Sequence, residues 1–518
     1  MFKKLLPLIS IVLAFNFFLY YYFSTKKPEV PAKSPVGGVL SSKLISVPMI
    51  NDPGDDLLVI HTDSLRLSFS KKSGILTQWS LVHYLSEDRK TPIDLLKSHP
   101  GYMGGGLLVK EKNGLVPLPL TGLLANNSPL SSDNVSAPSS GLILRENFSF
   151  EGHPVFLTYT IPSAGYRVNV SIDNPDKLPL SFMPGLNFGM TEGVQSYGTE
   201  FQGPIYADSA GKMTEFKKDQ AETFSSGMLS WVGNETKYFI GYLSLSDLKS
   251  KTEIIKDNTQ SLINVEIPEG TSSFSMVAEP KRYSLLKKAE PGLIDTVDFG
   301  WFLFGRIYLI SFLAKFLFLI LSNLFAHLGN YGFSIIMLTI LIKLLFSPLT
   351  YLSYRSMHQM QQLQPEIKKL QAKFKDDRAQ LNQAMMELYK ERRINPLGGC
   401  LPVLVQIPVF VALYNILNNT VELRQAPFLL WIHDLSLKDP YYVFPIIMGI
   451  SMLIQTRLTP TTPDPMQRRI MLFMPVVMTF FFLNFPSGLV LYWIVNNVLT
   501  IGQQYFTMRF IFKVSPAK

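Results

Sequence analysis

The sequence predicts a multi-domain membrane protein with six transmembrane α-helices, an antiparallel β-sandwich domain and a helical hairpin. Three observations lead to this prediction. The chain of 518 residues is 47% hydrophobic and only 17% charged, which is unusual for a soluble protein of that size. Apolar stretches of about the length that a bilayer requires recur beyond residue 331. Before them lies a long region in which apolar and polar residues alternate.

Charge and the amino terminus indicate how the chain is oriented. The formal net charge is +9, and the Lys and Arg residues gather beside apolar runs, as at a cytoplasmic membrane face. Residues 1–24 begin with Lys3 and Lys4 and continue as an apolar run, which predicts a retained transmembrane anchor. A cleaved signal peptide is the alternative, but no small-x-small cleavage pattern follows the run. Residues 25–56 are rich in Pro, Gly and Ser and are predicted to form a flexible linker.

Residues 57–298 are predicted to form the β-sandwich on the outer side of the membrane. Tyr166–Ile172 alternates apolar and polar residues and then meets Asn174-Pro175, and other short runs repeat the pattern. Because Cys400 is the one cysteine, this domain is expected to hold together by core packing without a disulfide. Its histidines lack evident acid partners and are interpreted as surface or core residues.

Residues 331–510 are predicted to form a core of five membrane-spanning helices. We interpret residues 299–330 as an amphipathic helix at the outer interface, because a crossing there would separate the basic loop after Leu352 from Lys3 and Lys4. Residues 511–518 then form a cytoplasmic tail, on the same side as the amino terminus. The predicted spans are Phe333–Leu352, Leu401–Asn419, Tyr442–Arg457, Ile470–Phe485 and Leu489–Met508.

Lys343 lies near the middle of its span, where a charged side chain costs roughly 2.5 to 3.5 kcal/mol. One interpretation is that it extends to the interface, helped by the helix-weakening Pro348. Because no Asp or Glu lies within a predicted span, we expect instead that Lys343 faces water or a visiting anion. Polar residues of other spans are expected to line the same groove, although each taken singly fits an interhelical hydrogen bond. These are Thr339, Gln406, Asn415, Thr479, Asn496, Asn497, Gln503 and Gln504.

Residues 354–399 are predicted to form an antiparallel helical hairpin in the cytoplasm. Apolar residues recur at helical spacing up to Phe374, and Asp377 with Gln380 is suited to cap a second helix. Its basic face and adaptable methionines favour partner docking, and a self-packed hairpin with an ordinary charged exterior is the alternative. The expected docking residues are Met357, Met360, Lys368, Lys369, Met385, Met386, Arg392 and Arg393.

Motifs of common enzymes are absent from the sequence. It has no Walker lysine loop, no HExxH, no Cys/His metal spacing and no carboxylate in a predicted span that could couple protons. We therefore expect no catalytic residues, no cofactor and no metal, and a protein that is not an enzyme.

Four stretches resemble the YidC family of membrane-protein insertases: Asn395–Cys400, Val421–Phe428, Trp431–Leu435 and Phe485–Tyr492. The resemblance runs from about Phe299 to Arg509, and the position and size of the β-domain are similar to the large periplasmic domain of the Gram-negative form. It implies a groove open to cytoplasm and lipid, with a cation in its first helix that attracts acidic substrate tails. Lys343 matches that position, where many members carry Arg, and Thr339, Tyr492 and Trp493 match positions along the substrate path.

The function implied is that of a membrane-protein insertase and chaperone in the bacterial inner membrane. It would receive hydrophobic segments of nascent inner-membrane proteins in a hydrated, positively charged groove and release them into lipid without nucleotide hydrolysis. Membrane lipids, a Sec-type translocon, the ribosome and signal-recognition targeting factors are the other candidate partners, and no nucleic-acid recognition is expected. A small-anion transporter or channel and a purely structural assembly factor are the alternatives.

Overall fold

The computed structural model describes residues 56–512, apart from residues 87, 97–103, 112–113, 131, 191–200, 218, 258–259, 298, 300, 303–304, 307, 375–376, 393–400 and 459–464. The predicted anchor, nearly all of the linker and the motif Asn395–Cys400 lie outside the described residues. The chain divides into two compact units, Met1–Thr296 and Val297–Lys518.

The described part of the first unit is built almost entirely of β-strands, so the prediction of a β-rich domain is confirmed. A five-stranded sheet has the order β4 (Pro92–Asp94), β3 (Leu76–Leu85), β2 (Leu65–Ser70), β1 (Leu57–His61) and β9 (Asn134–Ser136). A ten-stranded sheet has the order β15 (Met213–Glu215), β14 (Gly203–Asp208), β17 (Leu229–Glu235), β18 (Phe239–Ser244), β21 (Gly270–Pro280), β12 (Arg167–Asn174), β11 (His153–Ile161), β10 (Leu142–Phe150), β7 (Leu120–Ala125) and β8 (Ser128–Pro129).

A six-stranded sheet has the order β16 (Ala221–Phe224), β19 (Thr252–Asp257), β20 (Gln260–Ile267), β13 (Leu180–Met183), β5 (Gly106–Glu111) and β6 (Gly114–Pro117). Among the described pairs of this unit, β1 and β9 run parallel and the others antiparallel. The short helix α3 (Tyr283–Leu286) and the 3-10 turn η1 (Leu293–Thr296) close the unit.

Alternation in the sequence explains the strands, and apolar side chains between the sheets explain the core. In β12, Val168, Val170 and Ile172 are buried whereas Arg167 and Asn169 are exposed, as period two requires. Trp79 is fully buried on β3, and its indole N–H donates to the carbonyl oxygen of Ala278 on β21 at 3.2 Å. One apolar side chain thereby joins two sheets, and its polar atom is satisfied.

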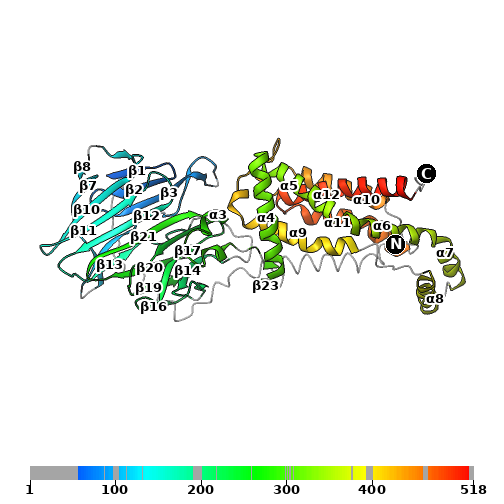
Figure 1. Cartoon of the computed structure of the whole chain (residues 1–518), viewed down its shortest axis with the longest axis horizontal. Helices are drawn as coiled ribbons and strands as arrows, with labels where there is room; N and C mark the ends of the chain where they lie inside the picture. The colour runs from blue at the N-terminus through cyan, green and yellow to red at the C-terminus, as the bar shows by residue number, and fades with distance from the viewer. Residues whose placement is uncertain are drawn as a thin grey trace. The chain divides into compact units, whose positions relative to one another are not determined.

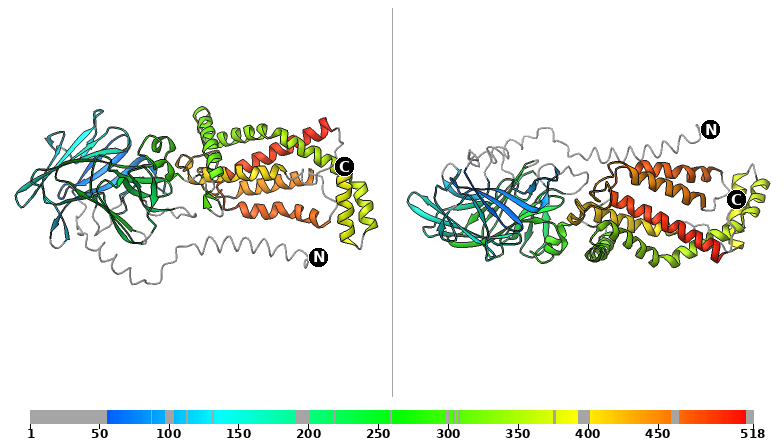
Figure 2. Two further views of the ribbon diagram at one scale, coloured as in Figure 1. Left: turned by 60° about the horizontal axis from the view of Figure 1, so that its bottom comes forward. Right: turned by 90° about the horizontal axis from the view of Figure 1, so that it is seen from above.

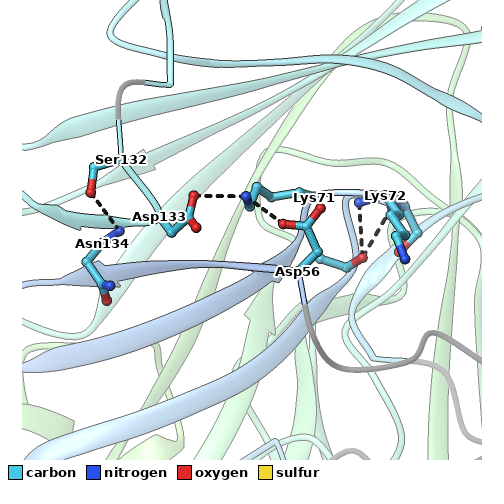
Figure 3. A network of polar contacts seen from close by, with 8 residues as sticks. Asp56, Lys71, Lys72, Ser132, Asp133 and Asn134 are labelled. Carbon is cyan, nitrogen blue, oxygen red and sulfur yellow. Dashed lines mark hydrogen bonds and ion pairs between the residues drawn. The ribbon is translucent and has the colours of Figure 1, made fainter.

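A surface ion network links the residue before β1 to two more distant segments of the domain (Figure 3). The ammonium of Lys71, which follows β2, contacts carboxylates of Asp56 and Asp133, the latter at 2.8 Å. Hydrogen bonds to Asp133 and Asp56 raise the pKa of Lys71 above its ordinary value. The network connects the residue before β1 to the segment before β9, which are neighbours in the sheet.

The second unit is helical in its described part (Figure 1). A two-residue hairpin of β22 (Trp301–Phe302) and β23 (Gly305–Arg306) precedes the helices. The helices are α4 (Tyr308–Leu328), α5 (Tyr331–Leu345), α6 (Ser347–Gln362), α7 (Gln364–Lys373), α8 (Arg378–Glu391), α9 (Leu401–Asn419), α10 (Val443–Leu458), α11 (Pro465–Phe482) and α12 (Ser487–Phe506), with short turns η3 (Val421–Leu423) and η4 (Thr507–Ile511). Helix α12 packs on α5 and α10, α4 packs on α5 and α9, and α10 packs on α11.

Among the described residues, the stretch Leu309–Leu328 of α4 is the one helix long and apolar enough to cross a membrane alone, and the bent pair α5–α6 is a second candidate if it counts as one span. Helices α10 and α11 are apolar but shorter. Figures 1 and 2 show α4 running across the direction of α5, α9 and α12. The interfacial placement of residues 299–330 is not tested by length and stays a prediction.

The structure differs from the predicted span Phe333–Leu352, because the helix breaks at Phe346 and bends by 62° there. The physical cause is Pro348, which occupies the first turn of α6. Proline has no N–H to continue the hydrogen-bond ladder, and it is tolerated where a new helix begins. A second proline, Pro365, likewise lies in the first turn of α7, so the first arm of the predicted hairpin is divided.

The predicted cap of α8 is confirmed. The carboxylate of Asp377 accepts hydrogen bonds from the backbone N–H groups of Ala379 and Gln380, both at 3.0 Å. Arg392 after the end of α8 forms an ion pair with Glu366 in the first turn of α7, at 2.9 Å. Because the end of one helix meets the start of the other, α7 and α8 are antiparallel.

Candidate functional site

Lys343 lies in the last turn of α5 and is half-buried. Its ammonium donates a hydrogen bond of 2.7 Å to the hydroxyl of Thr500 on α12. In the part of the chain that the structure describes, no carboxylate forms an ion pair with it. A charge in this position is therefore partly satisfied by a neutral hydroxyl and keeps N–H donors for other groups.

Thr500 is the point where three helices meet. Its hydroxyl donates to the carbonyl oxygen of Asn496 one turn earlier, at 2.6 Å. Its own carbonyl oxygen accepts a hydrogen bond of 3.2 Å from the hydroxyl of Tyr354 on α6. Side chains of α5 and α6 are thereby both attached to the same residue of α12.

A small cavity of about 30 Å³ lies beside the ammonium. That volume holds water, but it is far too small for a polypeptide helix. Helices α5, α6, α9 and α12 contribute its walls, so residues from early and late in the sequence of the helical unit meet there. The lining residues are Ile342, Lys343, Phe346, Leu349, Thr350, Val405, Gln406, Val409 and Asn496.

The structure brings Lys343, Gln406 and Asn496 together at this cavity. Gln406 donates a hydrogen bond of 3.1 Å to the hydroxyl of Tyr492, which is buried directly behind it. Trp493 packs against the rings of Phe410 and Phe482. An aromatic layer from α9, α11 and α12 thus adjoins the cavity.

Two predicted groove residues are buried in the helices that form the cavity but are not among its lining residues. Thr339 lies one turn before Lys343, and its hydroxyl donates to the carbonyl oxygen of Ile335 at 2.7 Å. Asn415 is buried on α9, more than two turns beyond Gln406.

The other predicted polar residues lie at helix contacts away from the cavity. The hydroxyl of Thr479 donates to the carbonyl oxygen of Pro475 in its own helix, and the side chain contacts α10 at Gly449. Asn497 donates to the hydroxyl of Ser451 at 2.9 Å, and Gln504 donates to the carbonyl oxygen of Leu458 at the same distance. Gln503 has a buried side-chain oxygen with no hydrogen-bond partner among the described residues.

The predicted docking residues are spread over three helices. Met357 and Met360 are half-buried on α6, and Lys368 and Lys369 are exposed on α7. On α8, Met385 is half-buried and Met386 is 51% exposed. Arg392 pairs with Glu366, whereas Arg393 lies outside the described residues.

Sequence reasoning missed Thr500 and Tyr354. Thr500 follows Asn496 by four residues, so the two share one face of a helix. This four-residue spacing from Asn496 was the signal that could have indicated Thr500, although Asn and Gln are stronger polar signals in an apolar helix than Thr. Tyr354 lies beyond the predicted end of its span, and only the bend at Phe346 explains how α6 returns to α12.

A helical unit with many exposed apolar side chains and a cation beside a small cavity, preceded in the sequence by a large β-rich domain, is typical of a membrane protein. The family model described as the YidC periplasmic domain matches residues 57–320, and the one described as 60Kd inner membrane protein matches residues 323–514. The chain belongs to the YidC family of membrane protein insertases.

Two relatives agree with this membership, and one solved structure is reported beside them for comparison. The membrane protein insertase YidC of Stutzerimonas stutzeri is 37% identical over 489 residues, which cover 88% of this chain and 84% of the relative. The one of Geotalea daltonii is 37% identical over 508 residues, 92% of each chain. A crystal structure of an active YidC insertase with its first transmembrane domain resolved is 19% identical, with a TM-score of 0.42, and the match covers 92% of this chain and 98% of that chain.

Proposed function

We propose that this protein receives nascent membrane proteins with their polar tails at Lys343 and releases their hydrophobic segments into the inner membrane. The observation that carries the proposal is the ammonium itself. It lies at the wall of a cavity that also has amide side chains, it donates to a neutral hydroxyl, and no carboxylate neutralises it among the described residues. Two of its three N–H donors remain for the acidic tail of a substrate.

The energy of lipid partition is sufficient to drive such insertion without nucleotide hydrolysis. A helix of about 20 apolar residues gains roughly 6 to 12 kcal/mol on entering the bilayer. The polar tail is the obstacle, because it must cross hydrocarbon. An ammonium about 4 Å from a carboxylate, at an effective dielectric constant of about 20, attracts it by about 4 kcal/mol. Water in the cavity and Lys343 would therefore lower the barrier where it is highest.

A six-span topology accompanies this function. In it, residues 1–24 anchor the amino terminus, residues 57–298 lie in the periplasm and residues 299–330 lie along the outer interface. Residues 331–510 form the five-helix core, and both termini are cytoplasmic. The charges of α7 support this orientation, because Lys368, Lys369 and Lys373 are exposed there.

The pair α7–α8 is the proposed docking module for ribosomes, targeting factors or a Sec-type translocon. Its exposed lysines present positive charge, and Met386 adds an adaptable apolar contact. Ile367 on α7 is buried, so the module is packed in part.

Reconstitution of the purified chain in vesicles tests the proposal. Protease-protected insertion of a short single-span protein with an acidic tail is measured for the wild type, for Lys343→Gln and for Lys343→Arg. We expect Lys343→Gln to lose most of the insertion and Lys343→Arg to retain much of it, because Arg keeps the charge. Lys438→Gln, which removes an exposed lysine of the loop before α10, is the matched control.

Undiminished insertion by Lys343→Gln would refute the role of the cation. The same vesicles, loaded with a chloride-sensitive dye, distinguish the small-anion transporter. Chloride flux without insertion would replace the proposed function by that alternative.

A further inference from the structure

The hydroxyl of Thr500 has a fixed hydrogen-bond direction. A threonine hydroxyl carries one O–H donor, and this donor is used on the carbonyl oxygen of Asn496, at 2.6 Å. What remains is a lone pair, and the ammonium of Lys343 donates to it at 2.7 Å. Thr500 is therefore an oriented acceptor that faces α5.

The backbone of Thr500 is held from a second side. The buried hydroxyl of Tyr354 donates to its carbonyl oxygen at 3.2 Å. Asn496, which receives the Thr500 hydroxyl, is itself a wall of the cavity beside Lys343. Asn496 thus forms the α12 side of the cavity, and the turn from Asn496 to Thr500 cannot rotate without loss of both contacts.

A lysine side chain needs such an anchor because its four-carbon stem is flexible and loses rotamer freedom when it is fixed. The next residues of α5, Leu344 and Leu345, are 62% and 72% exposed, so the exposed end of this helix is largely apolar. Without an acceptor in the cavity, the ammonium would leave it for more strongly hydrated positions.

We propose that Thr500 is a positioning residue, which holds one N–H of Lys343 so that the other two point into the cavity toward the carboxylate of a substrate tail. This inference rests on the proposed insertase function and adds a selectivity to it. Substrates with acidic tails depend on Thr500, and substrates with neutral tails of the same size do not.

The variant Thr500→Val keeps the shape of the side chain and removes the acceptor. We expect insertion of an acidic-tail substrate to fall about tenfold, the fold-change that corresponds to one hydrogen bond to a charged group. Thr500→Ser retains a hydroxyl that can make the same bond to Asn496, and it should insert the acidic-tail substrate within about twofold of the wild type.

The experiment uses the full chain in vesicles and two single-span substrates that differ by Asp against Asn in the tail. The readout is the ratio of their insertion rates, because a merely structural role of Thr500 would slow both alike. A selective loss in Thr500→Val with rescue by Thr500→Ser supports the proposal. An equal loss for both substrates, or no loss, overturns it.

Two further arms complete the test. If Thr500→Val does not fold, Thr500→Ala replaces it. A selective loss of insertion of the acidic-tail substrate then supports the proposal, and an unchanged ratio of the two insertion rates overturns it. If the proposed role of Lys343 in insertion is itself wrong, the result is different. Lys343→Gln then inserts both substrates at the wild-type rate.

Discussion

Glu146 on β10 is predicted to make the free energy of unfolding of the β-domain depend on pH. The residue is fully buried, and neither carboxylate oxygen has a hydrogen-bond partner among the described residues. The hydroxyl of Tyr159 on β11 is buried and equally unpartnered. Burial raises the pKa of Glu146 well above its ordinary value of 4.5, because an unpaired charge is costly in the core.

The sign of the pH dependence follows from this shift. Below the unfolded-state pKa of 4.5, the carboxyl is protonated in both states and has no effect on the pH dependence. Above it, the unfolded chain releases the proton while the folded domain keeps it. The free energy of unfolding therefore falls by about 1.4 kcal/mol per pH unit, until the pH reaches the raised folded-state pKa.

The variant Glu146→Gln cannot ionise and should not show this slope. Relative to the wild type, its free energy of unfolding should rise by about 1.4 kcal/mol for each pH unit above 4.5, up to the folded-state pKa. Urea unfolding of the detergent-solubilised chain measures it, with the fluorescence of Trp79 and Trp231 as the signal and the other tryptophans replaced by Phe.

The matched control is Glu111→Gln, which removes an exposed carboxylate at the end of β5 and should show no such trend. A difference between Glu146→Gln and the wild type that stays constant from pH 5 to pH 7 would show that Glu146 ionises freely in the folded domain. The reasoning from burial would then be wrong.

Three further perturbations test the packing. Lys281→Met should lower the free energy of unfolding by about 3 to 5 kcal/mol, because it removes the cation 2.7 Å from buried Glu235; the same urea titration measures it. Gly449→Ala should lower the melting temperature, because its methyl group would overlap the Thr479 hydroxyl at a cost of about 1 to 3 kcal/mol. Asp377→Ala should destabilise α8 by about 1 kcal/mol, seen as faster amide hydrogen exchange in its first turn.

Each of these has a control within the chain. Combining Gly449→Ala with Thr479→Ala should restore the melting temperature, and Gly502→Ala should not lower it, since among the described residues no atom outside the neighbouring helix backbone lies within 4 Å of the added methyl and alanine favours a helix more than glycine does. Asp377→Asn should keep the cap. Combining Lys281→Met with Glu235→Leu should recover most of the stability. A Gly449→Ala variant as stable as the wild type would contradict the close approach of α10 and α11.

Local signals in the sequence were strong where one residue type determines the structure. Helix α9 has the predicted bounds Leu401–Asn419, and Asp377 caps α8 as its spacing indicates. Non-local contacts were beyond reach, because alternation does not say which strands pair. The hydrogen bond from Trp79 to the carbonyl oxygen of Ala278 joins residues 199 positions apart.

The cavity was predicted in part for the same reason. An unpaired lysine in an apolar run is visible in the sequence, so Lys343 was found. Which polar residues of other helices meet it depends on how each helix is rotated. Asn496 faces the cavity and its neighbour Asn497 faces α10, a distinction that two adjacent identical residues cannot reveal before the helices are packed.

The bend at Phe346 has a consequence for the lipid around the bundle. Helix α5 has 15 residues before the bend, which gives it a length of about 22 Å, against about 30 Å for a hydrocarbon core. Helix α10, with 16 residues, is barely longer. If segments this short cross the bilayer as proposed, acyl chains beside them must compress to avoid hydrophobic mismatch. The protein would then thin the bilayer around it, and an incoming hydrophobic segment would cross a shorter hydrocarbon path there than elsewhere in the membrane.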